Sequence, residues 1–92
     1  GYRGIELFYY SLYSSFSKDV INMTIKELLN QGMIMLKNEN VDGPKVKARV
    51  LLQHILKKPR EYLIIYDKND VTPSQRDEYV KVIKRLILKF EN

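Results

Sequence analysis

The chain has 92 residues, a formal net charge of +5, one histidine and no cysteine. This length suits one small domain and leaves little room for a deep active-site cleft. The absence of cysteine excludes disulfides, thiolate metal sites and a cysteine nucleophile, and it is typical of a reducing interior, so we expect a cytoplasmic protein. The longest apolar run, Leu63–Tyr66, is far too short to cross a membrane, so no membrane partner is expected.

The first 22 residues differ from the rest in composition, since they hold six of the ten aromatic residues. Their apolar side chains recur at helical spacing, which favours a helix. Met23 has the character of a natural initiator, so residues 1–22 are either a native extension or an added leader. We expect this segment to pack on the remaining domain, residues 23–92, or to drive association with a second copy.

A first helix of the domain is expected after Met23, because Thr24 and Glu27 have the spacing of a capping box. Gly32 either weakens the middle of this helix or lets another helix approach closely. Asn38-Glu39-Asn40 is expected to end it. The predicted apolar stripe consists of Ile25, Leu28, Leu29, Met33 and Leu36.

Two shorter helices are expected between Asp42 and Tyr66, on either side of a Lys57-Lys58-Pro59-Arg60 corner. Asp42 or Gly43 should cap the first one, with Pro44 in its first turn, and Pro59 should start the second. The predicted core positions of the first are Val46, Val50, Leu51, Leu52, Ile55 and Leu56, and those of the second are Tyr62, Leu63 and Tyr66.

The last helix has the clearest start signal, because Thr72 and Gln75 repeat the capping-box spacing and Pro73 occupies the first helical position. The spacing of apolar residues is helical throughout, and no alternating run is bounded by hairpin turns. The sequence therefore predicts an all-α fold, a small bundle of four to five short helices. The side chains that the last helix should bury are Tyr79, Val80, Ile83, Leu86, Ile87 and Phe90.

Residues that carry chemistry are scarce, and the chain has no glycine-rich phosphate loop and no zinc-binding motif. His54 lacks a carboxylate at helical spacing to orient it, so a packed or interfacial structural role is favoured over a base or a pH switch. Asp77 and Glu78 are expected in the first turn of the last helix, where negative charge suits the helix dipole. We therefore expect no catalytic, cofactor-binding or metal-binding residue in this chain.

The candidate partner-binding residues are Lys57, Lys58 and Arg60. Three cations around the end of one helix and the start of the next can contact an RNA backbone or an acidic protein surface. Cations at a helix C-terminus also simply suit its dipole. The basic residues of the chain are spread over several segments, and acidic residues from Glu61 to Glu78 lie among them, which favours a solvated surface over a nucleic-acid stripe.

Four parts of the chain occur in the order of a known helical domain: residues 24–36, the A-x-x-L-L-x-H-x-L pattern of Ala48, Leu51, Leu52, His54 and Leu56, then Arg60, Leu63 and Tyr66, and finally residues 71–87. On these parts Thr24–Asn92 resembles the N-terminal domain of the HemK/PrmC family. These enzymes are protein-(glutamine-N5) methyltransferases that modify class I peptide-chain release factors. Lys47 and Arg49 depart from the family, in which acidic residues commonly flank the alanine between them.

The resemblance implies a substrate-recognition domain of a longer enzyme. The family binds S-adenosylmethionine through a glycine loop and uses a catalytic N-P-P-Y, and both belong to a downstream catalytic domain that is absent here. The chain alone is therefore not expected to methylate anything or to bind a cofactor. The expected partners are a release factor and the enzyme's own catalytic domain, and the alternative is a stand-alone basic helical module that binds nucleic acid or protein.

Overall fold

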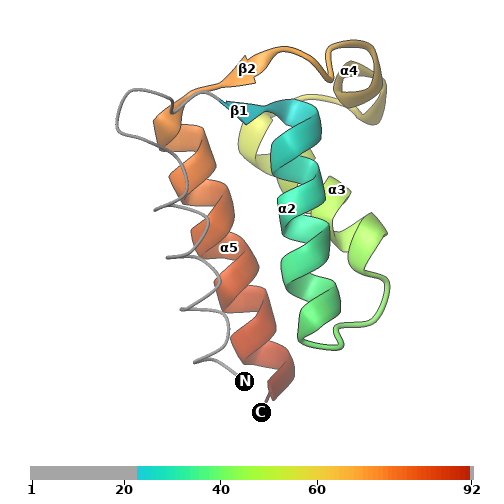
Figure 1. Cartoon of the computed structure of the whole chain (residues 1–92), viewed down its shortest axis with the longest axis vertical. Helices are drawn as coiled ribbons and strands as arrows, with labels where there is room; N and C mark the ends of the chain where they lie inside the picture. The colour runs from blue at the N-terminus through green and yellow to red at the C-terminus, as the bar shows by residue number, and fades with distance from the viewer. Residues whose placement is uncertain (1–22, 92) are drawn as a thin grey trace.

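The computed structural model describes residues 23–91, so the helix and the self-association expected of residues 1–22 lie outside the described part. Within it, four helices and one two-stranded sheet form a small bundle, and the all-α prediction is confirmed. Figure 1 shows α2 and α5 side by side, with the two short strands across one end. The elements are β1 (Met23–Thr24), α2 (Ile25–Asn38), α3 (Pro44–Leu56), α4 (Arg60–Ile65), β2 (Asp70–Val71) and α5 (Pro73–Glu91).

Helix α2 begins and ends where its sequence signals predicted. Thr24 Oγ1 accepts a hydrogen bond from Glu27 N at 3.1 Å, and the Glu27 carboxylate accepts one from Thr24 N at 2.9 Å, which confirms the capping box. After the helix, Asn40 adopts a left-handed backbone with φ 58°, and Val41 N donates to Leu36 O at 3.0 Å. This arrangement is a Schellman motif, and Asn tolerates its left-handed position better than most residues do.

An antiparallel sheet of two strands, each two residues long, joins the start of α2 to the segment after α4. The sequence pattern did not predict it. Met23 pairs with Val71, and Thr24 pairs with Asp70. Two residues are too few to show the alternation from which a strand is predicted. Two further amides at the start of α2 bond to the turn after α4, with Ile25 N donating to Asn69 O and Lys26 N to Asp67 O, each at 2.9 Å.

Helix α3 begins at Pro44 as predicted, and Gly43 is the residue that caps it. Gly43 has a left-handed backbone with φ 59°, which a residue with a side chain adopts only at a cost. Lys47 N donates to Gly43 O at 3.0 Å, and the Lys47 ammonium donates to the carbonyl of Asp42. The first turn of α3 is thus tied to the loop that precedes it.

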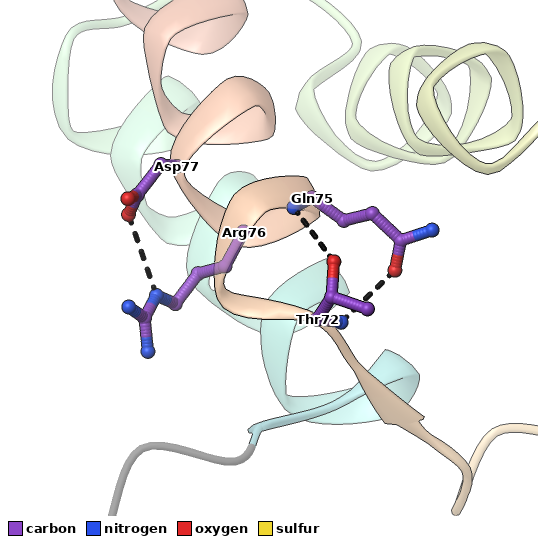
Figure 2. A network of polar contacts seen from close by, with 4 residues as sticks. All are labelled: Thr72, Gln75, Arg76 and Asp77. Carbon is purple, nitrogen blue, oxygen red and sulfur yellow. Dashed lines mark hydrogen bonds and ion pairs between the residues drawn. The ribbon is translucent and has the colours of Figure 1, made fainter.

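Figure 2 shows the start of α5, where the predicted capping box is present. Gln75 N donates to Thr72 Oγ1 and Thr72 N donates to Gln75 Oε1, each at 3.0 Å. Pro73 is the first residue of the helix, as predicted. The amide hydrogen that proline lacks would have no partner within the helix at this position.

The prediction that Asp77 and Glu78 lie in the first turn of α5 is wrong. The helix starts at Pro73, so both carboxylates belong to its second turn, and the first turn holds no acidic residue. Asp77 Oδ1 instead lies 3.6 Å from Nε of the nearly buried Arg76 (Figure 2). Asp77 is thus placed to pair with the neighbouring guanidinium and not to cap the helix.

One tyrosine connects three helices at the centre of the core. Tyr79 of α5 is fully buried, and its hydroxyl donates to Ala48 O of α3 at 2.8 Å. A Cβ on Gly32 of α2 would lie 2.2 Å from Tyr79 Oη and 2.8 Å from its ring, so Gly32 allows the close helix approach that was one of its two predicted roles. Burial raises the pKa of the Tyr79 hydroxyl, which keeps the group protonated as a donor.

Most predicted core positions are buried or partly buried against the core, with some shifts of face. In α2, Met35 is buried although it was outside the predicted stripe, whereas Leu29 and Met33 are only partly buried. The stripe was therefore displaced toward one side of the helix. The buried hydrophobic side chains of the described residues are Met23, Ile25, Leu28, Met35, Leu36, Val41, Ala48, Leu52, Leu63, Val71, Tyr79, Val80, Ile83 and Ile87.

Four residues predicted for the core are exposed. Val46 and Val50 of α3 are 55% and 50% exposed. They stand two residues before and after Ala48, about 200° around the helix, and it is Ala48 that faces the core. Tyr66, the residue that follows α4, is 45% exposed, and Phe90 is 54% exposed near the end of α5, where its ring centroid lies 4.9 Å from Lys47 Nζ.

Candidate interaction surface

The backbone conformations of Lys57 and Pro59 form the turn between α3 and α4, which we call the Lys57–Arg60 corner. Lys57 follows α3 with a left-handed φ of 56°, and the amides of Lys57 and Lys58 both donate to Gln53 O. Lys57 thus closes α3 as a left-handed C-terminal cap, with a lysine in the position that glycine usually occupies. Pro59 is extended, with φ −74° and ψ 168°, and caps α4. One helix thus ends and the next begins within a few residues that carry three cations.

All three candidate cations are exposed at this corner. Lys57 and Lys58 follow the C-terminal end of α3, where positive charge suits the helix dipole. Arg60 is the first residue of α4, where the dipole disfavours a cation. Dipole stabilisation therefore accounts for the two lysines but not for Arg60.

Aromatic rings support one side of the corner. Lys58 Nζ lies 4.8 Å from the centroid of the Tyr62 ring, which is a cation–π contact. The Tyr62 ring in turn lies 4.6 Å from that of Tyr66, centroid to centroid. Lys58 is therefore held against α4, whereas no described residue forms an ion pair with Lys57 or Arg60.

His54 is exposed on α3, so the prediction of a packed histidine is wrong. It lies two residues beyond the buried Leu52, on the side of the helix that points away from the core. Its imidazole forms no hydrogen bond or ion pair with another described residue. An interfacial role for His54 stays a prediction.

A groove of about 520 Å³ lies beside the outward part of α2. Leu29 and Met33 give it an apolar wall, and Lys26 and Lys45 stand at its edge. Among the side chains described in residues 23–90, no three or more of histidine or carboxylate are grouped so that they could hold a metal ion. No helix in that part of the chain is long and apolar enough to cross a bilayer.

The exposed side of α3 is the feature that the sequence analysis missed. Val46 and Val50 were assigned to the core because they fit the helical spacing of the longer apolar residues. Ala48 is the small residue of this helix, and small residues suit close helix contacts, so centring the buried face on Ala48 would have placed both valines outside.

Comparison with known families decides which kind of domain this is. The family described as the PrmC N-terminal domain matches residues 27–90, which is more than two thirds of the chain. The chain belongs to the PrmC N-terminal domain family. This match confirms the resemblance seen in the sequence, and the buried Ala48 and Leu52 of the A-x-x-L-L-x-H-x-L pattern form part of the core.

Relatives of this PrmC N-terminal domain are methyltransferases by name. A bifunctional methyltransferase of Rickettsia bellii (strain RML369-C) is 34% identical over 62 residues, 67% of this chain and 11% of the relative. A release factor glutamine methyltransferase of Aliivibrio fischeri (strain ATCC 700601 / ES114) is 32% identical over 65 residues, 71% of this chain and 23% of the relative. The chain thus spans less than a quarter of these relatives, and no solved structure matches it.

Proposed function

We propose that this chain is the substrate-recognition domain of a protein-(glutamine-N5) methyltransferase that acts on class I peptide-chain release factors. The observation that carries the proposal is the family match over residues 27–90, together with a relative named release factor glutamine methyltransferase. The domain is not catalytic by itself. S-adenosylmethionine is bound by a separate catalytic domain, and the whole enzyme works in the cytoplasm.

The role of the domain is to hold the release factor in register with the catalytic domain. Holding two reacting groups in the right geometry converts an encounter into an effectively unimolecular step, which contributes several kcal/mol to catalysis. A rigid domain with exposed cations suits this task because charged rim residues speed and orient the docking of a partner. The exposed Lys57, Lys58 and Arg60 are the proposed contact residues.

The test compares two substrates of the parent methyltransferase with and without this domain. For intact release factor, removal of the domain should lower kcat/KM by at least about tenfold, because docking energy is lost. For a short peptide that contains only the target glutamine, kcat/KM should stay nearly unchanged. Equal losses on both substrates would reject the proposal, since they would show that the domain supports the catalytic domain and not the substrate.

The second candidate is a nucleic-acid-binding module, which the basic pI of about 9.5 and the exposed corner favour. Phosphate contacts release counterions, so such binding weakens steeply with salt. Titration with RNA and DNA at about 50 mM and about 200 mM salt tests it. Salt-sensitive binding that is lost in Lys57→Gln/Lys58→Gln would support this candidate, and no binding at the lower salt would end it.

A further inference from the structure

The solvent side of α3 carries an apolar strip with cations beside it. Val46 and Val50 are one helical turn apart and are each at least half exposed. Lys45 is exposed beside Val46, and Arg49, beside Val50, donates from Nη1 to Gln53 Oε1 at 2.8 Å. We call Lys45, Val46, Arg49 and Val50 the α3 outer face. Two exposed β-branched side chains on one side of a helix give it an apolar contact surface.

The net charge of the chain is concentrated at this helix and the corner that follows. Residues 43–60 hold six of the 16 basic residues and none of the 11 acidic ones. The rest of the chain, with ten basic and eleven acidic residues, therefore has a formal net charge of −1. No described carboxylate forms an ion pair with Lys45 or Arg49. Asp42 and Glu61 flank this region in the sequence, and Glu27 lines the groove beside Lys45. The six cations of the region outnumber these three carboxylates, so the region favours a negatively charged partner.

The combination of features favours a protein partner over a nucleic acid. A phosphate backbone needs cations but gains nothing from Val46 and Val50, because exposed valines offer neither a charge nor a flat ring on which bases stack. An amphipathic helix with apolar residues one turn apart and acidic residues beside them complements both parts of the face. From Lys45 to Val50 these residues span about 7.5 Å along the helix, which one to two turns of a partner helix cover.

We propose that the α3 outer face binds an acidic amphipathic helix of a partner protein. Resting on the proposed function, this inference assigns the docking helix to the release factor. Leu29 and Met33 extend the apolar surface toward α2, because Lys45 borders both the groove beside them and the α3 outer face. The partner's apolar side chains cover Val46 and Val50, and its carboxylates lie near Lys45 and Arg49.

The test is chemical-shift mapping on the full 92-residue chain labelled with ¹⁵N. It is titrated separately with intact class I release factor and with a synthetic amphipathic helical peptide of leucine and glutamate. A scrambled peptide of the same composition controls for charge alone. Shift changes centred on Val46 and Val50, with at least about fivefold weaker binding of the scrambled peptide, are expected.

Two variants with matched controls sharpen the test. Val50→Ser and Lys45→Glu should each weaken binding of the amphipathic peptide by at least about threefold, because each removes one part of the complementary surface. The controls are Ile65→Ser, which removes an apolar side chain that is 69% exposed on α4, and Lys81→Glu, which makes the same charge change on α5. Both controls should leave the affinity unchanged.

The two titrations separate this inference from the proposed function. Release-factor shifts away from α3 would overturn the inference and leave the proposed function intact. Peptide binding on α3 without any release-factor binding would support the face and count against the function. Equal binding of the scrambled peptide, shifts on α3 that depend only on protein concentration, or RNA binding there that Val50→Ser does not weaken would each overturn the inference.

Discussion

The inner and outer sides of helix α3 differ in their contacts and in their exposure to solvent. On the inner side, the Ala48 carbonyl accepts a hydrogen bond from the buried Tyr79 hydroxyl. The same tyrosine packs so closely on Gly32 of α2 that a Cβ added there would have no space. On the outer side, Val46 and Val50 lie half exposed next to Lys45, which has no partner among the described residues. Changes on the inner side should therefore alter stability, whereas changes on the outer side should alter binding and leave the fold intact.

The largest effect is expected from Gly32→Ala. In an open helix this change stabilises by about 1 kcal/mol, because alanine is the better helix former. Here the new Cβ would lie 2.2 Å from Tyr79 Oη, so we expect a destabilisation of at least about 2 kcal/mol in urea unfolding. Tyr79→Phe in the same chain should reduce that cost by removing the nearest atom. A free energy of unfolding equal to or above that of the wild type would contradict the tight inner side.

Tyr79→Phe alone should destabilise by about 1 kcal/mol, the usual net value of one buried hydrogen bond. The hydroxyl is lost from the Ala48 carbonyl while the ring keeps its packing. Urea unfolding at neutral pH measures this difference. If the variant is as stable as the wild type, the hydrogen bond makes no net contribution and the inner side is held by packing alone.

The same pair of proteins should differ in their response to alkaline pH. Burial raises the pKa of Tyr79 in the folded chain, whereas in the unfolded chain it ionises near its usual value of about 10. The unfolded state then loses a proton that the folded state keeps, so the wild type loses stability as pH rises above about 10. Tyr79→Phe has no hydroxyl at this position, so the free energy of unfolding of the wild type should fall relative to that of the variant as pH rises above about 10. If the free energies of unfolding of the two proteins change in parallel between about pH 9 and about pH 11, the claim of a buried neutral hydroxyl is contradicted.

A smaller effect of opposite sign is expected from Lys57→Gly. Lys57 has a left-handed φ of 56°, which glycine adopts without steric cost, so the variant should be more stable by about 0.5 to 1 kcal/mol. Lys58→Gly is the matched control, since φ of Lys58 is not positive and no such gain is expected. Thermal unfolding distinguishes the two. A loss of stability in Lys57→Gly would show that the lysine side chain stabilises the fold by more than its left-handed backbone costs.

The smallest change in stability is expected from Val50→Ser on the outer side. The side chain is already half exposed, so the free energy of unfolding should stay within about 0.5 kcal/mol of the wild type. Leu52→Ser, on the buried side of the same helix, should cost several times more. Similar losses in both variants, measured by urea unfolding, would show that the two sides of α3 are not distinct.

The starts and ends of the helices were predictable because they depend on local chemistry. The Thr24–Glu27 and Thr72–Gln75 boxes, and the proline that follows Thr72, each use residues within one turn. The β1–β2 pair was not predictable, since it joins residues far apart in the sequence and each strand has only two residues. The exposure of Val46 and Val50 was missed for a related reason, because helical spacing shows a wide apolar arc but not which part of it meets another helix.

The candidate site was predictable in part. Lys57, Lys58 and Arg60 lie exposed at one corner, and their binding role stays a prediction. The cation–π contact of Lys58 with Tyr62 depends on how the corner folds, so the sequence analysis did not include it. His54 was placed in or near the core because it borders long apolar residues, but its orientation depends on where Ala48 and Leu52 meet the other helices.

The most direct test of the whole account is calorimetric titration of the full 92-residue chain with intact class I release factor. The account predicts saturable binding that weakens severalfold between about 50 mM and about 200 mM salt, because exposed cations guide the docking. No heat of binding at either salt concentration, with a chain that unfolds cooperatively in the same buffer, would contradict the claim that this domain recognises the substrate.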